Sequence, residues 1–305
     1  MKEQIKEGQL ELGFQDLTHE FVKFLLAKME YAPPSGPPHK CRRIDGKRFD
    51  SEVIRDISSC SHVWKINLAG NRKLGDEVTT YLPMLPKTIS DIDLSGYGLS
   101  ATGVRNVCKF MESNETITKL IMCGNIVDED GARHIRDMLK QNTTLQEFCC
   151  CTAPSLTTNM KLLVADGLEH NQTLQKLSLD YCAGDFVDAA VYHKFRSVLE
   201  RAGNNSAVKT LEIGAINRDA NIDLWEGTVQ KCENLCHFGP NSSSFAYNRS
   251  LMYYRALNMC NARKITRGGE FDEFKSAVKK AVQNRNINVT YFLLRNNVDC
   301  ISRVS

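Results

Sequence analysis

The sequence predicts an α/β solenoid, a chain of repeated strand–helix units, and two observations support this. An aliphatic phrase restarts seven times at intervals of 26 to 34 residues, a period typical of solenoids whose repeat is one strand and one helix. Within each phrase the hydrophobic residues alternate, and after it they follow helical spacing. The seven phrases start at Val63, Ile89, Ile117, Leu145, Leu174, Val208 and Leu235.

Each phrase predicts one short strand of a parallel sheet. Its fourth and sixth residues, such as Ile66 and Leu68, point to one side of the strand, and the residues next to them point to the other. Asn71 and Asn125 follow two of the strands as polar turn residues. Other residues take this position in later repeats: Tyr97, Ala153 and Cys182.

Each turn is followed by a predicted helix. Leu156, Met160, Val164 and Leu168, for example, recur at the spacing of one helical face. A strand and a full helix in every repeat predict a horseshoe, with a parallel concave sheet inside and helices outside. We expect this array to span residues 51–262, with its first strand near residue 63.

The two ends of the chain differ from the array, and repeat arrays need caps at their ends. Residues 1–50 predict a helix over 14–30 and a proline-rich linker, in which the P-x-x-P segment 34–37 is interpreted as a spacer. A helix around 53–57 is expected to cover the first repeat. Residues 263–305 predict a helical cap with helices over 271–282 and 288–295, although 289–299 also resembles half of an ankyrin repeat.

The best-formed units carry a family resemblance. The phrase Leu174-Gln-Lys-Leu-Ser-Leu and the preceding Asn171-Gln-Thr-Leu, in repeats of about 28 residues, resemble the ribonuclease inhibitor-like leucine-rich repeat family. The resemblance covers about two thirds of the chain. It implies a protein-binding scaffold, since relatives include inhibitors, immune sensors, actin-capping tropomodulins and activators of Ran-type GTPases. It does not select one of these subfamilies.

Three Asn-x-Thr triplets start at Asn114, Asn142 and Asn171. They match the glycosylation signal, but they also recur in phase with the repeat. Their phase favours a structural role, in which Asn ends a helix and Thr enters the next strand.

The cysteines predict reduced thiols inside a cell. The chain has twelve, but Cys108 and Cys150 fall at helix and core-facing strand positions, where a thiol acts as a small apolar group. Cys149, Cys150 and Cys151 are consecutive on one strand, so alternation turns the middle thiol away from its neighbours. We therefore expect core packing there and no metal site.

A second group, Cys232, Cys236 and His237, approaches the spacing of zinc ligands. It crosses from a helix to a strand and has no second pair of cysteines, so we expect no zinc there. The sequence predicts no metal and no cofactor.

The concave face is the predicted partner-binding surface, and its residues follow from the strand phase. Position three of successive strands alternates in charge sign over the first five repeats, which predicts that neighbouring strands neutralise each other. Position five has an apolar centre. Position three holds Lys65, Asp91, Lys119, Glu147, Lys176, Thr210 and His237. Position five holds Asn67, Asp93, Ile121, Cys149, Ser178 and Glu212. Together these residues form the predicted partner-binding set, except Thr210 and His237, which are not included in it.

Charge is uneven along the chain. Residues 1–50 carry a net charge of +1, residues 51–248 of −5, and residues 249–305 of +7. The basic end would attract an acidic protein surface, membrane headgroups or RNA, but it has no nucleic-acid motif and a solvated helix face is the simpler interpretation. The sequence predicts neither a signal peptide nor a transmembrane segment.

These patterns predict a non-enzymatic, monomeric, cytoplasmic scaffold that binds another protein through its concave face or its atypical ends. No small-molecule substrate is expected, and nucleic acid is an unlikely partner. One alternative is a GTPase-activating protein, in which Arg72, followed by Asp76 and Glu77, stabilises the transferred phosphate. Another is a bacterial effector that acts in a host cell.

Overall fold

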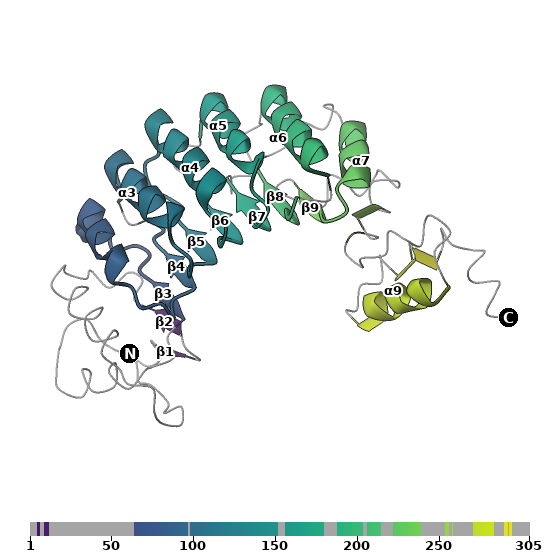
Figure 1. Ribbon diagram of the computed structural model, residues 1–305, viewed down its shortest axis with the longest axis horizontal. Coiled ribbons are helices and arrows are strands. Elements are labelled where there is room, and N and C mark those ends of the chain that lie inside the picture. Colours follow the sequence, from purple (N-terminus) through teal and green to yellow (C-terminus); the bar gives the residue numbers. More distant parts are fainter. Residues whose placement is uncertain are drawn as a thin grey trace. The chain divides into compact units, whose positions relative to one another are not determined.

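The computed structural model contains both helices and strands, and it divides into two compact units, Met1–Asp180 and Tyr181–Ser305. It describes residues 5–6, 9–11, 64–96, 98–151, 156–179, 188–203, 206–214, 222–238, 254–255, 258, 271–283, 290–291 and 293–294. The two units are described separately below. Figure 1 labels their elements along the chain.

The first unit is built on a parallel sheet. Strands β2 to β7 follow one another in chain order, each parallel to the next, and β1 pairs antiparallel with β2. The strands are β1 (Ile5–Lys6), β2 (Gln9–Glu11), β3 (Lys65–Asn67), β4 (Asp91–Asp93), β5 (Lys119–Ile121), β6 (Glu147–Cys149) and β7 (Lys176–Ser178). The phrases of the sequence analysis correctly predicted β3 to β7. They did not predict β1 and β2.

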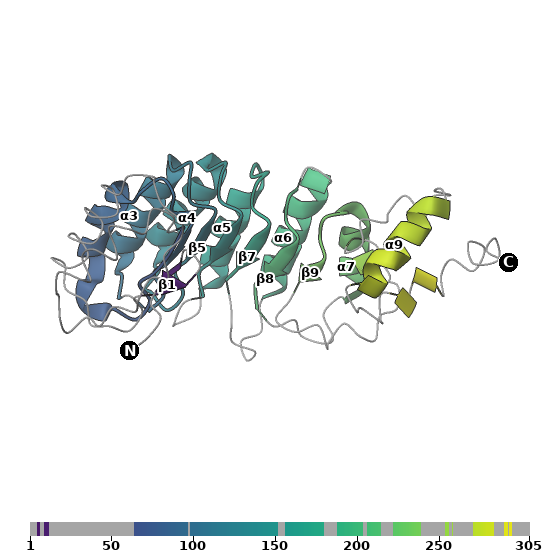
Figure 2. The ribbon, with the colours of Figure 1, turned by 90° about the horizontal axis from the view of Figure 1, so that it is seen from below.

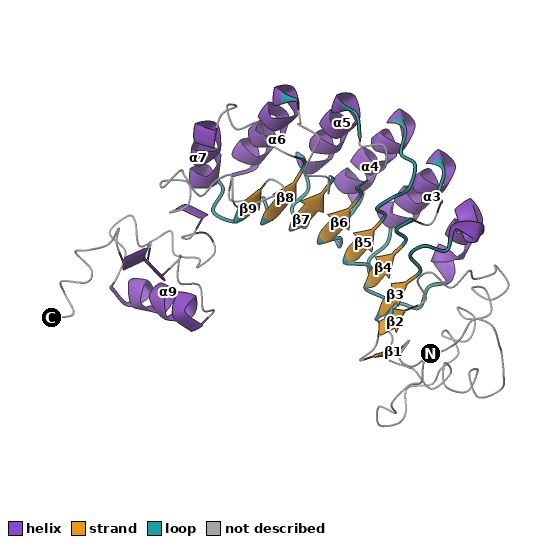
Figure 3. Ribbon diagram, turned by 180° about the vertical axis from the view of Figure 1, so that it is seen from behind, coloured by secondary structure: helices purple, strands orange, loops and turns teal. Residues whose placement is uncertain are grey.

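Helical segments alternate with these strands and lie on one face of the sheet (Figures 2 and 3). They are η1 (Arg72–Met84), α3 (Ala101–Glu112), α4 (Glu129–Gln141) and α5 (Thr158–Leu168). The helix α4 packs against both α3 and α5. This arrangement confirms an α/β fold with a parallel sheet and helices on its outer side.

The first repeat departs from the predicted full helix. Its segment η1 is a 3₁₀ helix interrupted at Gly75, whose φ of 48° lies in the left-handed region. Pro83, near its end, has no N–H to donate. Glycine adopts this backbone conformation without the strain that a Cβ would add. In this repeat an interrupted 3₁₀ helix therefore replaces the predicted full helix.

The hydrophobic alternation predicted along each strand matches the burial of its residues. The central residue of each strand, from Ile66 on β3 to Leu177 on β7, is almost fully buried between the sheet and the helices. The helices supply the opposite side of this core, for example Val104 of α3 and Ile135 of α4, which are both completely buried. Burial of this apolar surface is the main free-energy gain that holds successive repeats together.

Side-chain caps fix where the helices begin. The side chains of Ser100, Asp128 and Thr157 accept backbone N–H bonds at the starts of α3, α4 and α5. Such bonds satisfy donors that have no partner within the helix. In unit 1 they set the point at which each turn becomes a helix.

The Asn-x-Thr asparagines form a buried ladder between repeats. Asn142 donates to the carbonyl oxygens of Met111 (2.6 Å) and Asn114 (3.0 Å) in the preceding repeat, and its own oxygen accepts from Leu145 N (2.6 Å). Asn171 repeats this pattern one unit later, with bonds to Leu139 and Asn142. Asn142 and Asn171 are both buried, so a glycan would not fit the folded chain.

Asn114, in the first triplet, is half-buried, and its side-chain oxygen accepts from the N–H groups of Thr116 and Ile117. The asparagines therefore have a structural role. The threonines do not enter the next strand as predicted, because β5, β6 and β7 each begin three residues after the threonine of the triplet.

The second unit continues the alternation of helix and strand. Strands β8 (Thr210–Glu212) and β9 (His237–Phe238) pair in parallel. The helices are α6 (Ala189–Ala202), α7 (Ile222–Lys231) and α9 (Phe271–Gln283). The described residues of the predicted helix 288–295 are also helical.

Asn258 extends the asparagine ladder in this unit. It is buried, and its side chain donates to the carbonyl oxygens of Val229, Cys232 and Leu235 at 3.3, 3.0 and 2.8 Å. Val229 lies in the last turn of α7 and Cys232 directly follows that helix. Asn142 and Asn171 likewise bind carbonyl oxygens at the end of the preceding helix and just after it. Asn258 therefore occupies the position of the next asparagine after the seventh phrase.

Several predicted features lie outside the described residues. These are the helix over 14–30, the proline-rich linker, the helix around 53–57, and residues Tyr97, Ala153 and Cys182. Among the helices that the structure describes, none is long and apolar enough to cross a membrane.

Candidate functional site

The face of the unit 1 sheet that points away from α3, α4 and α5 is the candidate site. We call it the open sheet face and define it by positions three and five of strands β3 to β7. Ten of the eleven predicted partner-binding residues lie on these strands, and Glu212 lies on β8 of the second unit. In unit 1, no described helix covers this face (Figure 3).

Position three forms a row of alternating charge across five strands. The register pairs Lys65 with Asp91, Asp91 with Lys119, Lys119 with Glu147, and Glu147 with Lys176. Lys119 Nζ lies 2.6 Å from Glu147 Oε2. This bond to Glu147, aided by the charges of Glu147 and Asp91, raises the pKa of Lys119 above its usual value. The row is therefore a set of neighbouring opposite charges and not a positive stripe.

Position five changes character along the sheet. Asn67 and Asp93 use their side-chain oxygens to accept the N–H of Ala69 and Ser95, each at 2.9 Å, so they close the turns after their own strands. Ile121 and Cys149 take this position on the next two strands and pair in register. Both are half-buried, which leaves an apolar and thiol-bearing patch at the centre of the row.

Ser178, the last predicted residue on this face, is completely buried. Its hydroxyl oxygen lies 3.7 Å from the thiol of Cys151, in the preceding repeat. Ser178 consequently offers no surface to a partner, and the accessible patch is centred on Ile121 and Cys149.

A cluster of three thiols adjoins this patch. Cys149 is at the end of β6, Cys151 follows two residues later, and Cys123 follows β5. Hydrogen bonding by the thiols of Cys123 and Cys151, and more weakly by Ser178, together with the charge of Lys176, lowers the pKa of Cys149. The same bonding raises the pKa of the other two thiols.

Sequence analysis considered Cys149, Cys150 and Cys151 but missed Cys123, which is 28 residues before Cys151. That spacing is one repeat, and it could have been recognised as a signal that the two thiols are neighbours. As expected from alternation, Cys150 turns to the other side and is completely buried. Burial strongly raises its pKa.

The second cysteine group is engaged in local contacts. Cys232 Sγ donates to the carbonyl oxygen of Leu199 and Cys236 Sγ to that of Asn234, each at 3.2 Å. His237 Nδ1 lies 3.2 Å from a guanidinium nitrogen of Arg255. Within the described ranges, no three Cys, His, Asp or Glu side chains converge in a way that would hold a metal ion.

The residues of the GTPase alternative lie at the start of η1. Arg72 is exposed. The carboxylate of Asp76 accepts from the backbone N–H of Ser100 (2.8 Å) and from the Ser100 hydroxyl. Asp76 therefore links its repeat to Ser100, the N-cap residue of α3. This structural role accounts for the presence of Asp76.

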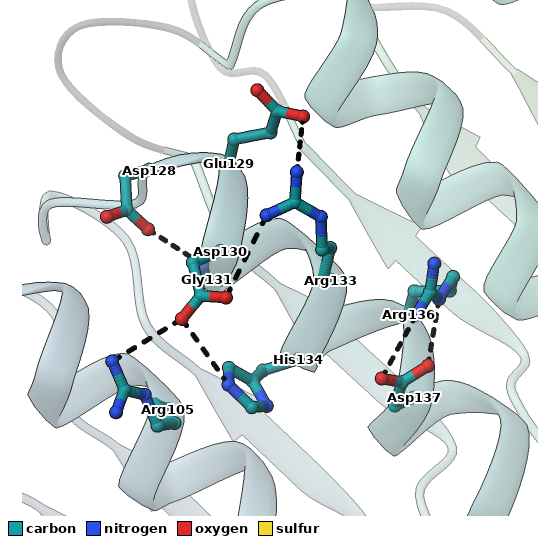
Figure 4. A network of polar contacts seen from close by, with 9 residues as sticks. All are labelled: Arg105, Asp128, Glu129, Asp130, Gly131, Arg133, His134, Arg136 and Asp137. Atoms are coloured by element: carbon teal, nitrogen blue, oxygen red, sulfur yellow. Dashed lines mark hydrogen bonds and ion pairs between the residues drawn. The ribbon is translucent and has the colours of Figure 1, made fainter.

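A polar network on the helix side links α3 to α4 (Figure 4). Asp130 forms ion pairs with Arg105 of α3 at 3.4 Å and with Arg133 at 3.9 Å, and it lies 3.5 Å from His134 Nε2. Glu129 completes it through a 2.7 Å bond to Arg133. Most of these side chains are well exposed, so the network adds modestly to packing between the two helices.

Comparisons with known proteins add no family assignment. No family model matches this chain, and no curated protein matches it significantly.

Proposed function

We propose that the protein is a non-enzymatic interaction scaffold that docks another protein on its open sheet face. Its fold is proposed to be a leucine-rich repeat horseshoe of the ribonuclease inhibitor-like type, and its partner a folded protein or a segment of one. The observation that carries the proposal is the register of position five, which places Ile121 beside Cys149 on a face that none of the described helices of unit 1 covers.

The chemistry of this face suits a protein partner. Protein interfaces commonly combine an apolar centre with a polar rim that remains partly hydrated. Here Ile121 and Cys149 form the centre, and the charged row from Lys65 to Lys176 forms one rim. Since Lys119 is already bonded to Glu147, this rim presents hydrogen-bonding groups without a large excess of one charge.

The same charge pattern argues against a phosphate-rich ligand. Nucleic acid and phosphorylated surfaces require several cations whose charge is not neutralised nearby. On the open sheet face each lysine of the row has a carboxylate at the same position of a neighbouring strand. We therefore propose that nucleic acid suits this face less well than a protein partner does.

Quantitative affinity purification tests the proposal with three baits: the parent protein, Ile121→Asp and Ile126→Asp. Ile126 supplies a matched control because it is five residues away, follows the turn after β5 and is 60% exposed. We expect a partner that is retained by the parent and by Ile126→Asp and is lost from Ile121→Asp.

Equal recovery of every bound protein by all three baits would contradict docking on this face. If the partner were lost from Ile126→Asp alone, the binding surface would instead lie on the helix side of the sheet. Circular dichroism of the purified baits should be the same for all three, because neither isoleucine is among the buried core residues of the described chain.

A further inference from the structure

The C-terminal part of the second unit combines positive charge with exposed apolar side chains. Residues 274–298 contain five basic residues and no acidic one. Of the five large apolar side chains that the described residues expose, three belong to this segment: Val282 (57% exposed), Tyr291 (54%) and Leu294 (36%). A single exposed apolar residue is ordinary, whereas a group of them within one basic segment is typical of a binding surface.

The helix α9, yellow in Figure 1, places Val282 beside two of the lysines. Lys275, Lys279 and Val282 recur at intervals of four and three residues, so they lie on one face of this helix. All three are exposed, whereas Ala281 is buried and marks the inward side of the helix. Lys280 is exposed as well. The outer side of α9 therefore presents an apolar side chain surrounded by ammonium groups.

A second helical stretch carries the other two exposed apolar side chains. Tyr291 and Leu294 are three residues apart and share one face, while Leu293 is completely buried. Six residues separate Gln283, the end of α9, from Thr290. Because an extended chain spans at most about 3.6 Å per residue, these two residues are no more than about 25 Å apart. One flat surface is large enough to contact both stretches.

We propose that residues 274–298 form a docking surface for a lipid bilayer with anionic headgroups. The lysine ammonium groups contact the headgroups, and Val282, Tyr291 and Leu294 enter the boundary between the headgroups and the acyl chains. Segments that lie in this boundary bind through buried apolar area together with attraction to anionic lipids. Tyrosine suits this depth because its ring is apolar and its hydroxyl is polar. This surface belongs to the second unit and does not depend on docking at the open sheet face.

The apolar side chains favour a bilayer over other anionic ligands. Nucleic acid binds through its phosphates and through base stacking on aromatic rings, and the aliphatic Val282 and Leu294 contribute to neither. An acidic protein would need a surface shaped to fit side chains from two helical stretches, whereas a fluid bilayer adapts to them. The lysines explain a preference for anionic lipids, because each lysine at such a membrane surface strengthens binding by about fivefold.

Co-sedimentation of the full chain with vesicles tests this surface. One kind of vesicle contains phosphatidylcholine alone, and the other contains phosphatidylcholine with about 30% phosphatidylserine. We expect binding to the anionic vesicles that weakens as salt is added, and binding to the neutral vesicles that is at least about tenfold weaker. Equal binding to both kinds, or binding to neither, would overturn the proposal.

The double variant Lys279→Gln and Lys280→Gln should weaken binding to the anionic vesicles by about 25-fold, at about fivefold for each lysine. The matched control is Lys109→Gln with Lys140→Gln, which removes the same charge from exposed positions in the last turns of α3 and α4. This control should bind like the parent. Equal losses in the two double variants would show that only the net charge of the chain matters, and would refute the site.

Val282→Ser tests the apolar contribution without a change of charge. It should weaken binding to the anionic vesicles by about fivefold, since a half-exposed valine loses its contact with the acyl boundary. Ile126→Ser is the matched control, because Ile126 is similarly exposed in the first unit, and it should have no effect. Unchanged binding of Val282→Ser would contradict insertion. Circular dichroism should be the same for all variants, because every replaced side chain is exposed.

Polyuridylate and polyglutamate provide anionic charge without an apolar layer. The parent chain should bind both polymers more weakly than it binds the anionic vesicles, and Val282→Ser should not alter that weaker binding. Binding to either polymer without binding to the vesicles would assign this segment to nucleic acid or to an acidic protein, and would overturn the proposal.

Discussion

At the residue scale, the buried asparagines contribute more to folding than their polar nature suggests. Asn142 bonds to two carbonyl oxygens of the preceding repeat and to two backbone N–H groups of its own turn, those of Thr144 and Leu145. Without this side chain, Met111 O and Leu145 N would lose a buried hydrogen bond, and Asn114 O and Thr144 N would lose a part-buried one. The amide therefore satisfies the backbone at a place where regular secondary structure ends.

The substitution Asn142→Ala should lower the free energy of unfolding by about 2–4 kcal/mol, because each buried polar group left without a partner costs about 1–3 kcal/mol. Thr143→Ala, at an exposed neighbouring position, should change it by less than about 0.5 kcal/mol. Urea denaturation measures both values. Equal stability of the two variants would show that the ladder is dispensable.

The ion pair of Lys119 and Glu147 should behave differently, since both side chains are more than a third exposed. Solvent screens such pairs, and their measured contributions range from about 0 to 1 kcal/mol. Lys119→Ala should therefore change the denaturation midpoint only slightly and should weaken partner binding by less than about fivefold. A larger loss of affinity would identify Lys119 as a direct contact of the partner.

At the element scale, the spacing of α4 and α5 depends on one small residue. A Cβ added at Gly167 would lie 2.9 Å from the carbonyl oxygen of Arg136 and 3.0 Å from Leu139 Cβ. The first of these atoms is backbone, so it cannot move aside by a change of rotamer. Gly167 thus permits the close approach of the two helices.

Gly167→Ala should lower the melting temperature, with a cost of about 1–3 kcal/mol that is typical of overpacking. Gly227→Ala is the matched control on α7, where an added Cβ meets no atom within 4 Å. That substitution should be neutral or raise stability by about 0.5–1 kcal/mol, because alanine favours a helix. Scanning calorimetry of the two variants would contradict the account if they shifted in the same direction.

At the scale of the whole molecule, alternation predicted the strands because hydrophobic periodicity directly reflects which face is buried. Ile66, Leu120 and Leu177 illustrate this, and all three are nearly inaccessible. The strands β1 and β2 were not predictable in this way because their residues precede the repeated phrases and share no repeat phase with them. Their place depends on pairing with β3, which is remote in sequence.

The sequence predicted which residues lie on the open sheet face, but it predicted less well how exposed each of them is. Repeat phase identified Ile121 and Cys149 as register partners, and the structure pairs them. Phase alone did not indicate that Ser178 is buried, because phase predicts the side of the strand on which a residue lies and not its contacts with neighbouring repeats, such as that of Ser178 with Cys151. Cys123 was missed for a related reason, since its neighbours come from a different repeat.

Salt dependence distinguishes two surfaces of the whole molecule. Binding through the open sheet face should change by less than about fivefold between 50 and 300 mM salt, because its charged row is neutralised locally. Binding through the basic segment 249–305, with eleven basic and four acidic residues, should weaken steeply over that range. Isothermal titration at several salt concentrations separates these outcomes.

The most direct measurement of the central claim is the dissociation constant of the identified partner for four proteins: the parent, Ile121→Asp, Ile126→Asp and a chain lacking residues 268–305. The account predicts that Ile121→Asp weakens binding by about a hundredfold or more, because it buries a charge at the apolar centre. The other two variants should bind like the parent. Binding that survives Ile121→Asp and is lost with residues 268–305, in a truncated chain that still folds, would contradict docking on the open sheet face.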